Sequence, residues 1–266
     1  MTNSRPHLDS DSADVPTVGR AESPLPLPIE LIRKERRDRA FLAWVEADCY
    51  PILSHGYRSF LHPDERLFFE SLKYKRRQSS YLMGRYAAKM ALSCYLQERD
   101  MTAIAVVPGV FTQPVVRCGS FRRPAVTISH IKKVACAIVF PDECPLGMDV
   151  EAIKASNATV MQSQMTSKEI MDFAEKEEDE ICSLTVLWTA KEALSKVLKC
   201  GLTCPFEVMA VDRLEKHGQL YEGGYSNFQQ YGFQSWLTPK AVITIALPKE
   251  TRMQVDMTAF LERLRQ

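Results

Sequence analysis

The sequence lacks the cysteine patterns that mark zinc sites, redox motifs or secreted disulfide frameworks. Its eight cysteines are scattered between Cys49 and Cys204, without a Cys-x-x-Cys pair and without a histidine at zinc-ligand spacing. Reduced cysteines behave as small apolar residues in a protein core. We therefore expect free thiols that contribute mainly to packing.

A long apolar segment is also missing. No uninterrupted apolar run is long enough to span a bilayer, and residues 1–23 contain no apolar stretch of signal-peptide length. We therefore expect a cytoplasmic protein that has no membrane partner.

The chain has no excess of charge of one sign. Lys and Arg total 34, Asp and Glu total 33, and the net charge is +1. Without a global field we expect no nucleic-acid partner, and any selectivity for a charged ligand must come from local clusters. Hydrophobic residues make up 45% of the chain, which suits a globular protein with a sizeable core.

Proline is unevenly distributed and separates the first segment from the rest. Residues 1–30 contain five of the fifteen prolines and few large apolar residues. Such a composition buries too little surface to offset the entropy lost on ordering. We predict a flexible tail over residues 1–35, an N-terminal lobe over 36–143 and a C-terminal lobe over 144–266, divided at the proline-bounded break 141–145.

Apolar spacing predicts secondary structure in both lobes. Residues 41–45 and 67–72 have the spacing of helix faces that turn toward a core. The apolar runs 125–129, 134–140 and 241–247 are typical of strands, and the first two are joined by a short turn. Because helices and strands alternate in each half, we predict an α+β protein of two similar-sized lobes.

Two carboxylates stand in an alternating segment at the start of the second half. In Met148-Asp149-Val150-Glu151 the apolar residues would face the core of a strand and both carboxylates the opposite side. Like charges at this spacing repel each other, and a hard cation such as Mg²⁺ would relieve the repulsion. A solvated polar strand face would have the same pattern.

A second acidic residue pattern lies on a predicted helix, residues 187–198. Trp188, Glu192 and Lys196 follow each other at intervals of four residues and so share one stripe of the helix. Taken alone, Glu192 and Lys196 would be an ordinary surface pair worth roughly 0.2–0.5 kcal/mol.

Basic residues also cluster where another helix is predicted to begin, at Lys75-Arg76-Arg77. Cations at a helix N-terminus oppose the helix dipole unless they face water or an anion is bound there. A serine and a histidine, Ser129 and His130, end the strand predicted from residue 125.

These pieces together resemble the monomeric, surfactin-synthetase-activating type of 4′-phosphopantetheinyl transferase. The signatures of that family are a Ser-His step, a Gly-x-Asp-x-Glu strand and a Trp-x-x-Lys-Glu-x-x-x-Lys helix, and all three occur here in order, at Ser129, Gly147 and Trp188. The resemblance covers roughly residues 40–210, with further similarity at Arg76, Gly84-Arg85, 109–114 and 199–202.

The resemblance implies two related α+β lobes that form a pseudo-dimer, with coenzyme A as co-substrate in the cleft between them. Asp149, Glu151 and Glu192 would hold Mg²⁺, and Lys196 would contact phosphate. Ser129 and His130 would bind the nucleotide phosphates, and Arg76 and Arg85 would assist at the 3′-phosphate.

The implied reaction is attack by a serine of an apo acyl or peptidyl carrier protein on the β-phosphate of coenzyme A, with release of adenosine 3′,5′-bisphosphate. Asp149, Glu192 and Lys196 would be the catalytic residues. Glu192 would accept the serine proton directly or through a metal-bound water. The carrier could serve fatty acid, polyketide or nonribosomal peptide synthesis. Two other functions stay open: a different magnesium-dependent phosphate-transfer or hydrolysis enzyme, and a non-catalytic protein that binds coenzyme A or carriers.

The sequence departs from the family pattern at two positions near the expected nucleotide. Ile131 stands where many relatives have a second serine, and Gln113 stands where many have a lysine before proline. Lys132 and Lys133 are the candidate replacements for the missing hydrogen bond, and Arg122 and Arg123 are those for the missing cation.

Overall fold

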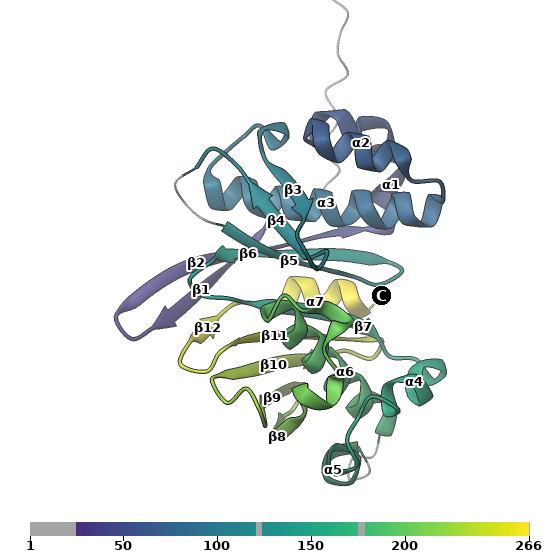
Figure 1. Ribbon diagram of the computed structural model, residues 1–266, viewed down its shortest axis with the longest axis vertical. Coiled ribbons are helices and arrows are strands. Elements are labelled where there is room, and N and C mark those ends of the chain that lie inside the picture. The colour runs from purple at the N-terminus through teal and green to yellow at the C-terminus, as the bar shows by residue number, and fades with distance from the viewer. Residues whose placement is uncertain (1–24, 121–123, 175–178, 266) are drawn as a thin grey trace, which may run out of the picture.

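The computed structural model describes residues 25–120, 124–174 and 179–265, and within these it contains two five-stranded antiparallel sheets that face each other (Figure 1). In spatial order the first sheet consists of β12 (Arg252–Gln254), β1 (Leu27–Arg33), β2 (Arg36–Glu46), β6 (Val134–Pro141) and β5 (Pro124–His130). The second consists of β7 (Gly147–Ala152), β11 (Ala241–Pro248), β10 (Tyr231–Leu237), β9 (Leu220–Tyr225) and β8 (Val211–His217). A separate ribbon pairs β3 (Ala105–Pro108) with β4 (Pro114–Arg117).

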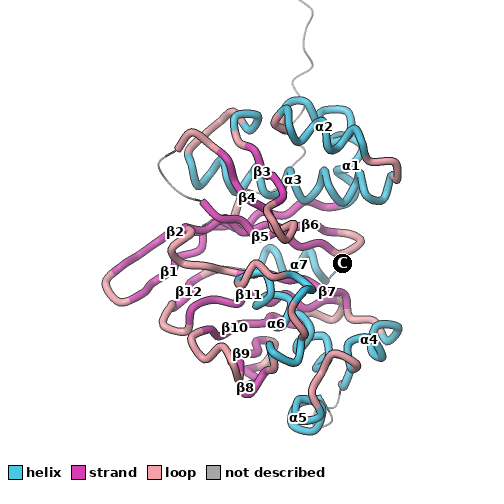
Figure 2. Tube along the Cα trace, in the orientation of Figure 1, coloured by secondary structure: helices cyan, strands magenta, loops and turns pink. Residues whose placement is uncertain are grey.

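The helices cover the outer faces of the two sheets, as Figure 2 shows by colour. The first lobe contains α1 (Tyr50–Gly56), α2 (Pro63–Ser71) and α3 (Lys75–Leu96), and the second contains α4 (Ala158–Gln162), α5 (Ser167–Glu169), the π-helical turn η5 (Ile170–Ala174) and α6 (Glu180–Val197). A last helix, α7 (Thr258–Arg265), lies between the sheets (Figure 1). Short 3₁₀ turns are η1 (Ala47–Cys49), η2 (Tyr57–Ser59), η3 (Met101–Ala103), η4 (Ala155–Asn157), η6 (Gly201–Thr203) and η7 (Phe206–Met209).

Three cores result from this layering. The central core lies between the inner faces of the two sheets and includes Leu42 and Trp44 of β2 together with Phe260 of α7. One outer core joins α3 to the first sheet, and the other joins α6 to the second. Burial of these apolar faces supplies the main driving force for the fold. The predicted α+β protein of two similar lobes is confirmed.

The strands predicted at residues 125–129, 134–140 and 241–247 are confirmed as β5, β6 and β11. β5 and β6 pair antiparallel with Thr127 opposite Ile138. The predicted helix at 67–72 is confirmed as α2, but the helix predicted at 41–45 is wrong, because these residues belong to β2. β2 is buried on both faces, so its sequence reads as a continuous apolar run that period alone cannot distinguish from a helix.

Two of the predicted segment boundaries are also wrong. The predicted tail, residues 1–35, includes β1, whose Ile29 and Leu31 belong to the central core. Residues 1–24 of that tail lie outside the described residues. The predicted C-terminal lobe, 144–266, includes β12, which leaves the second sheet and pairs with β1 at the edge of the first. β1 has a period of two at Leu27, Ile29 and Leu31 and forms a hairpin with β2, so the proline-rich composition outweighed a strand signal that was present. β12 has three residues, and only its pairing with β1 defines it.

No helix in the described part of the chain is both long enough and apolar enough to cross a membrane.

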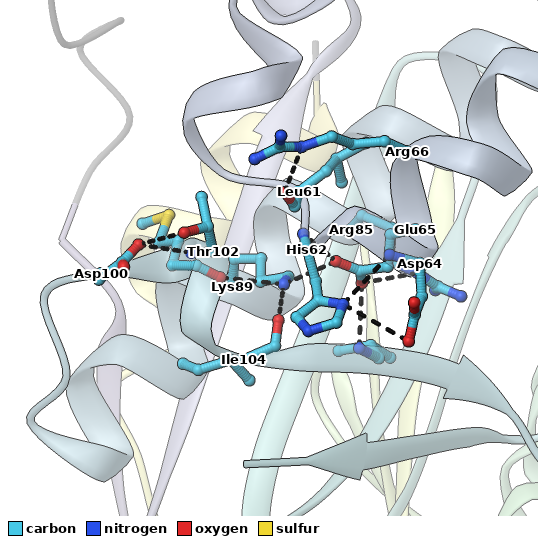
Figure 3. A network of polar contacts seen from close by, with 12 residues as sticks. Leu61, His62, Asp64, Glu65, Arg66, Arg85, Lys89, Asp100, Thr102 and Ile104 are labelled. Carbon is cyan, nitrogen blue, oxygen red and sulfur yellow. Dashed lines mark hydrogen bonds and ion pairs between the residues drawn. The ribbon is translucent and has the colours of Figure 1, made fainter. Parts of the chain in front are cut away.

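A buried ion pair fastens α3 in the first lobe (Figure 3). Glu65 caps α2 in a capping box with His62, and its second oxygen accepts a hydrogen bond of 3.0 Å from the backbone N–H of Val106. Lys89 of α3 lies 2.7 Å from Glu65, and both side chains are almost completely buried. We call this set of capping-box glutamate, buried lysine and strand amide a clamp. Arg85, one turn before Lys89, lies 3.5 Å from the same carboxylate.

The second lobe contains the same clamp. Glu169 caps α5 in a capping box with Thr166 and accepts a hydrogen bond of 2.9 Å from the backbone N–H of Val211. Lys191 of α6 lies 2.8 Å from Glu169 and also donates to the carbonyl of Gln164. In both lobes the clamp ties a short helix, the long central helix and the strand that follows it. This recurrence identifies the two lobes as structural repeats.

We predict that Lys191→Met destabilises the protein by about 3–5 kcal/mol, because it leaves the buried Glu169 carboxylate without its counter-charge. Lys89→Met should have a similar effect in the first lobe. Urea unfolding followed by circular dichroism measures the loss. The double change Lys191→Met with Glu169→Gln should recover at least half of it, since the amide is neutral and keeps an acceptor for Val211. A loss below about 1 kcal/mol for Lys191→Met would contradict the clamp.

Candidate active site

The candidate site forms where β7 lies directly against α6. Gly147 makes this approach possible, because a Cβ at this position would lie 1.9 Å from the backbone oxygen of Ala193. Close packing against α6 therefore explains why the first residue of the Gly-x-Asp-x-Glu pattern is a glycine. The close contact brings the carboxylates of β7 next to Glu192 and Lys196 on α6.

The predicted alternation of β7 is confirmed. Met148 and Val150 are fully buried in the central core, while Asp149 and Glu151 project from the other face of the strand. Asp149 is buried, with 4% of its surface exposed, and Glu151 is half-buried. The solvated strand face that the sequence also allowed is excluded, because Asp149 has almost no contact with water.

Lys196 reaches across from α6 to β7. Its Nζ donates hydrogen bonds of 2.8 Å to Asp149 Oδ1 and of 2.8 Å to the carbonyl of Met148. The helix-surface pair with Glu192 that the sequence allowed is replaced by a partly buried ion pair with Asp149. Lys196 thus connects the two elements that carry the site.

Ser129 approaches Asp149 from the first lobe. Its Oγ donates a hydrogen bond of 2.8 Å to Asp149 Oδ1 and accepts one of 3.2 Å from the backbone N–H of Val150. The neighbouring His130 ends β5 and points into the cleft between the lobes. Partial burial and the nearby charge of Lys196 lower the pKa of His130, and Arg76 adds to this effect.

The other oxygen of Asp149 is buried without a hydrogen-bond partner among the described residues. A buried carboxylate oxygen in this condition is costly, and an ion or a water is the usual explanation. Oδ1 already accepts from Ser129 and Lys196, so Oδ2 is the oxygen that remains for a ligand.

Asp149 lies close enough to Glu151 and Glu192 for its negative charge to raise the pKa of both. Burial raises the pKa of Glu151 to about 7, and the negative charges of Asp149 and Glu192 contribute, while Lys196 and a hydrogen bond from the Trp188 side chain oppose the rise. Burial and the charge of Asp149 likewise raise the pKa of Glu192. A divalent cation among these groups would favour their charged forms.

The donor set fits magnesium better than a metal that needs a complete protein cage. Across residues 25–120, 124–174 and 179–265, no group of three or more His, Cys, Asp or Glu side chains converges on one point as a finished metal site. Magnesium binds through one or two carboxylates and keeps water and substrate phosphate as its other ligands. Asp149 Oδ2, which has no hydrogen-bond partner among the described residues, and Glu151, which lines the cleft, meet this smaller requirement.

A cleft of about 1500 Å³ opens beside the carboxylates and is lined by both lobes. Glu151 stands on its wall, and the ionisable residues that can be cationic along it come from both lobes: Arg76, Arg77, Arg85, His130, Lys132 and Lys154. A smaller cavity of about 660 Å³, lined in part by Lys196, lies on the other side of Thr112, which contributes to both. Asp64, Glu65 and Glu151 also line the cleft, so its five Lys and Arg side chains leave a modest local excess of positive charge.

The two predicted arginines have different surroundings. Arg76 is exposed in the first turn of α3 and lies close enough to His130 to shift its pKa. Arg85 is half-buried, stacks on the ring of Tyr81 at 4.7 Å and lies beside Glu65 of the first clamp. Figure 3 shows Arg85 next to this clamp. Both line the cleft, whereas Asp149, Glu192 and Ser129 are not among the residues that line it.

The structure shows where Gln113, which departs from the family pattern, and two of the candidate replacement residues lie. Gln113 folds back over its own turn, where its Oε1 accepts a hydrogen bond of 2.8 Å from the backbone N–H of Phe111. Among the candidate replacements, Lys132 lines the cleft and Lys133 does not. The candidates Arg122 and Arg123 lie outside the described residues.

Sequence reasoning missed the residues that hold the site residues in place. Lys191 and Glu169 anchor α6. Thr127, two residues before Ser129 on β5, accepts a hydrogen bond from the backbone N–H of Met148. The capping-box spacing from Thr166 to Glu169 could have drawn attention to that glutamate. Its burial and its lysine partner had no sequence signal.

The fold and site define a two-lobe α+β protein whose acidic residues stand beside a cationic cleft, the arrangement of a phosphate-handling enzyme. Residues 145–246 match the family model of the 4′-phosphopantetheinyl transferase superfamily. This match confirms, for the second lobe, the resemblance predicted from the motifs. The matched span contains all four site residues from β7 and α6: Asp149, Glu151, Glu192 and Lys196.

Three solved structures give weaker likenesses. A holo-(acyl-carrier-protein) synthase from Bacillus anthracis, in complex with CoA (3′,5′-ADP), is 22% identical and aligns over 44% of this chain and 97% of its own, with a TM-score of 0.35. The holo-ACP-synthase from Plasmodium yoelii is 16% identical over 44% and 93%, with a TM-score of 0.33. The Thermotoga maritima holo-[acyl-carrier-protein] synthase is 16% identical over 48% and 77%, with a TM-score of 0.32. TM-scores of this size carry no argument about the present chain. No curated protein matches its sequence.

The raised pKa of Glu151 predicts a pH dependence of stability. The folded protein holds this proton more tightly than the unfolded chain, so the stabilisation is fully present below pH 4.5 and is lost as the pH rises to about 7. Without metal, the unfolding free energy of the wild type minus that of Glu151→Gln should therefore fall across this window. Urea unfolding of both proteins at a series of pH values measures the difference. A difference that stays constant with pH would contradict the raised pKa of Glu151.

Proposed function

We propose that this protein transfers the 4′-phosphopantetheine group of coenzyme A to a serine of an apo acyl or peptidyl carrier protein and releases adenosine 3′,5′-bisphosphate. The observation that carries the proposal is the group of Asp149, Glu151 and Glu192 beside a cleft lined by cations from both lobes. Coenzyme A is anionic at its pyrophosphate and at its 3′-phosphate, which matches such a cleft. The family match of residues 145–246 supports the same substrate.

The residues of β7 and α6 would hold magnesium against the pyrophosphate. Asp149 would bind through Oδ2, with Glu151 and Glu192 as further ligands. When bound, the cation neutralises charge on the phosphate that is transferred and on the one that leaves. Lys196 is held by Asp149 and by the Met148 carbonyl, which places its charge beside the proposed magnesium ligands.

Glu192 is the proposed acceptor of the serine proton, directly or across one intervening water. Burial and the charge of Asp149 raise the pKa of Glu192 in the metal-free protein, whereas a cation bound to Glu192 would lower this pKa and make it a weaker base. Most of the rate enhancement would come from positioning and electrostatics, because phosphoryl-type transfer asks little covalent chemistry of the protein.

The nucleotide would bind along the cleft wall. Arg76 and Arg85 would contact the 3′-phosphate, and His130 would donate a hydrogen bond to a nucleotide phosphate, with Lys132 as an additional cation. The resemblance also implies a phosphate contact for Ser129, although its hydroxyl proton is given to Asp149 in this structure. We further expect a monomer that acts in the cytoplasm on carriers of fatty acid, polyketide or nonribosomal peptide synthesis.

We predict that the purified protein, given coenzyme A and Mg²⁺, adds one phosphopantetheine group to an apo carrier, detected by intact-protein mass spectrometry. Glu192→Ala should lower the turnover about 10²-fold or more, the usual contribution of a general base. The control is Glu180→Ala, which removes an exposed glutamate at the start of the same helix. Chelation of the metal should stop the reaction. Phosphate release without carrier modification, or coenzyme A binding without either reaction, would contradict the proposal.

We predict that Arg76→Ala weakens binding of adenosine 3′,5′-bisphosphate about 10-fold or more, because a charge-assisted hydrogen bond is worth roughly 1.5–3 kcal/mol. Isothermal titration calorimetry measures the dissociation constant. The matched control is Lys75→Ala, since Lys75 is an exposed cation of the same helical turn that does not line the cleft. An equal loss in both variants would show a general effect of charge instead of a contact at Arg76.

A further inference from the structure

The two lobes meet at a line where two sheet edges run side by side. β5 is the last strand of the first sheet and β7 is the first strand of the second, so each has one side without a strand partner in its own sheet. The edge N–H groups of β7 are buried here, and buried backbone donors need acceptors. Hydroxyl side chains of β5 supply them. We call this line, made by Thr127 and Ser129 with residues 148–150, the seam.

The seam contains two bonds of the same type. Thr127 Oγ1 accepts a hydrogen bond of 3.2 Å from the backbone N–H of Met148, and Ser129 Oγ accepts one of 3.2 Å from that of Val150. Both hydroxyls are buried, with 4% and 6% of the residue surface exposed. They differ in the group that receives their proton. Thr127 donates to the Met148 carbonyl at 3.5 Å, whereas Ser129 donates to Asp149 Oδ1 at 2.8 Å.

The proton of Ser129 therefore acts on the carboxylate of the candidate metal site. Asp149 Oδ1 accepts from Ser129 on the first lobe and from Lys196 on the second, both at 2.8 Å. Two donors from different directions fix the plane of the carboxylate. The remaining oxygen, Oδ2, is buried and lacks a hydrogen-bond partner among the described residues. A hydroxyl has one proton, so Ser129 cannot donate to a phosphate while it donates to Asp149.

We infer that Ser129 is a positioning residue, which orients Asp149 from the opposite lobe so that Oδ2 is presented to the cation. The inference rests on the proposed metal-dependent transfer and assigns Ser129 a role other than the phosphate contact that the family resemblance implies. It also makes the metal site dependent on the docking of the lobes, because the carboxylate and the hydroxyl that orients it come from different sheets. Residues that orient a metal ligand commonly change metal affinity by about 10- to 100-fold.

The test measures metal binding in the absence of substrate, with Mn²⁺ as the probe and its electron paramagnetic resonance signal as the readout. Ser129→Ala should weaken Mn²⁺ binding about 10-fold or more, and Ser129→Thr, which keeps the hydroxyl, should restore most of the affinity. Thr127→Val is the matched control, since it removes a seam bond that does not touch Asp149. It should lower the unfolding temperature and change Mn²⁺ affinity less than about 2-fold.

A second measurement separates positioning from phosphate contact. Binding of adenosine 3′,5′-bisphosphate without metal should be the same in Ser129→Ala and the wild type. Weakened metal-free bisphosphate binding with unchanged Mn²⁺ binding would overturn the inference in favour of a phosphate contact. Equal losses of Mn²⁺ affinity in Ser129→Ala and Thr127→Val would overturn it in favour of a general loosening of the seam, and absence of Mn²⁺ binding in the wild type would overturn it outright. A protein that binds Mn²⁺ as expected but modifies no carrier would disprove the proposed function and leave the role of Ser129 intact.

Discussion

The Asp149 carboxylate connects almost every part of this structure. It is buried, and a buried charge is tolerated only where other groups compensate it. The compensation comes from both lobes, through Ser129 of β5 and Lys196 of α6. The position of α6 in turn depends on Gly147, which lets the helix lie against β7, and on Lys191, which ties it to Glu169. The surroundings of this one carboxylate thus depend on the contact between the two sheets, on the packing of α6 and on the register of β7.

The two lobes repeat one construction and have diverged in what it carries. Each long helix contains a buried lysine that pairs with a capping-box glutamate, and each glutamate also accepts a hydrogen bond from the strand that follows. In the second lobe the residue after this lysine is Glu192, a carboxylate of the site. In the first lobe it is Met90, an apolar residue of the core. The first lobe instead presents Arg85, one turn earlier, to the cleft. Because of this difference, the long helix of the second lobe contributes a carboxylate to the site, and that of the first lobe contributes a cation to the cleft.

A chain with a net charge of +1 can still present a local group of cations to a ligand. The cations along the cleft come from separate elements, so their fields add only after folding. The carboxylates of β7 and α6 have the opposite sign, and burial raises the pKa of both Glu151 and Glu192. Acidic ligands and basic walls placed side by side suit a substrate that brings its own negative charge and shares a cation with the protein.

The sequence by itself determined the class of fold, the strands β5, β6, β7 and β11 and the strand face that Asp149 shares with Glu151, because alternation and motif spacing are local properties. Asp149 and Glu151 were predicted to share one side of a strand, and they do. The sequence misread β2 as helix, since a strand buried on both faces has no period of two. It also missed β1, which forms a hairpin with β2, and β12, which pairs with β1 from the far end of the chain. Tertiary structure alone decided that Lys196 pairs with Asp149 instead of Glu192, and that Ser129 faces Asp149. Both contacts join residues far apart in sequence across a buried interface, and no local pattern records which polar groups such an interface leaves in need of partners.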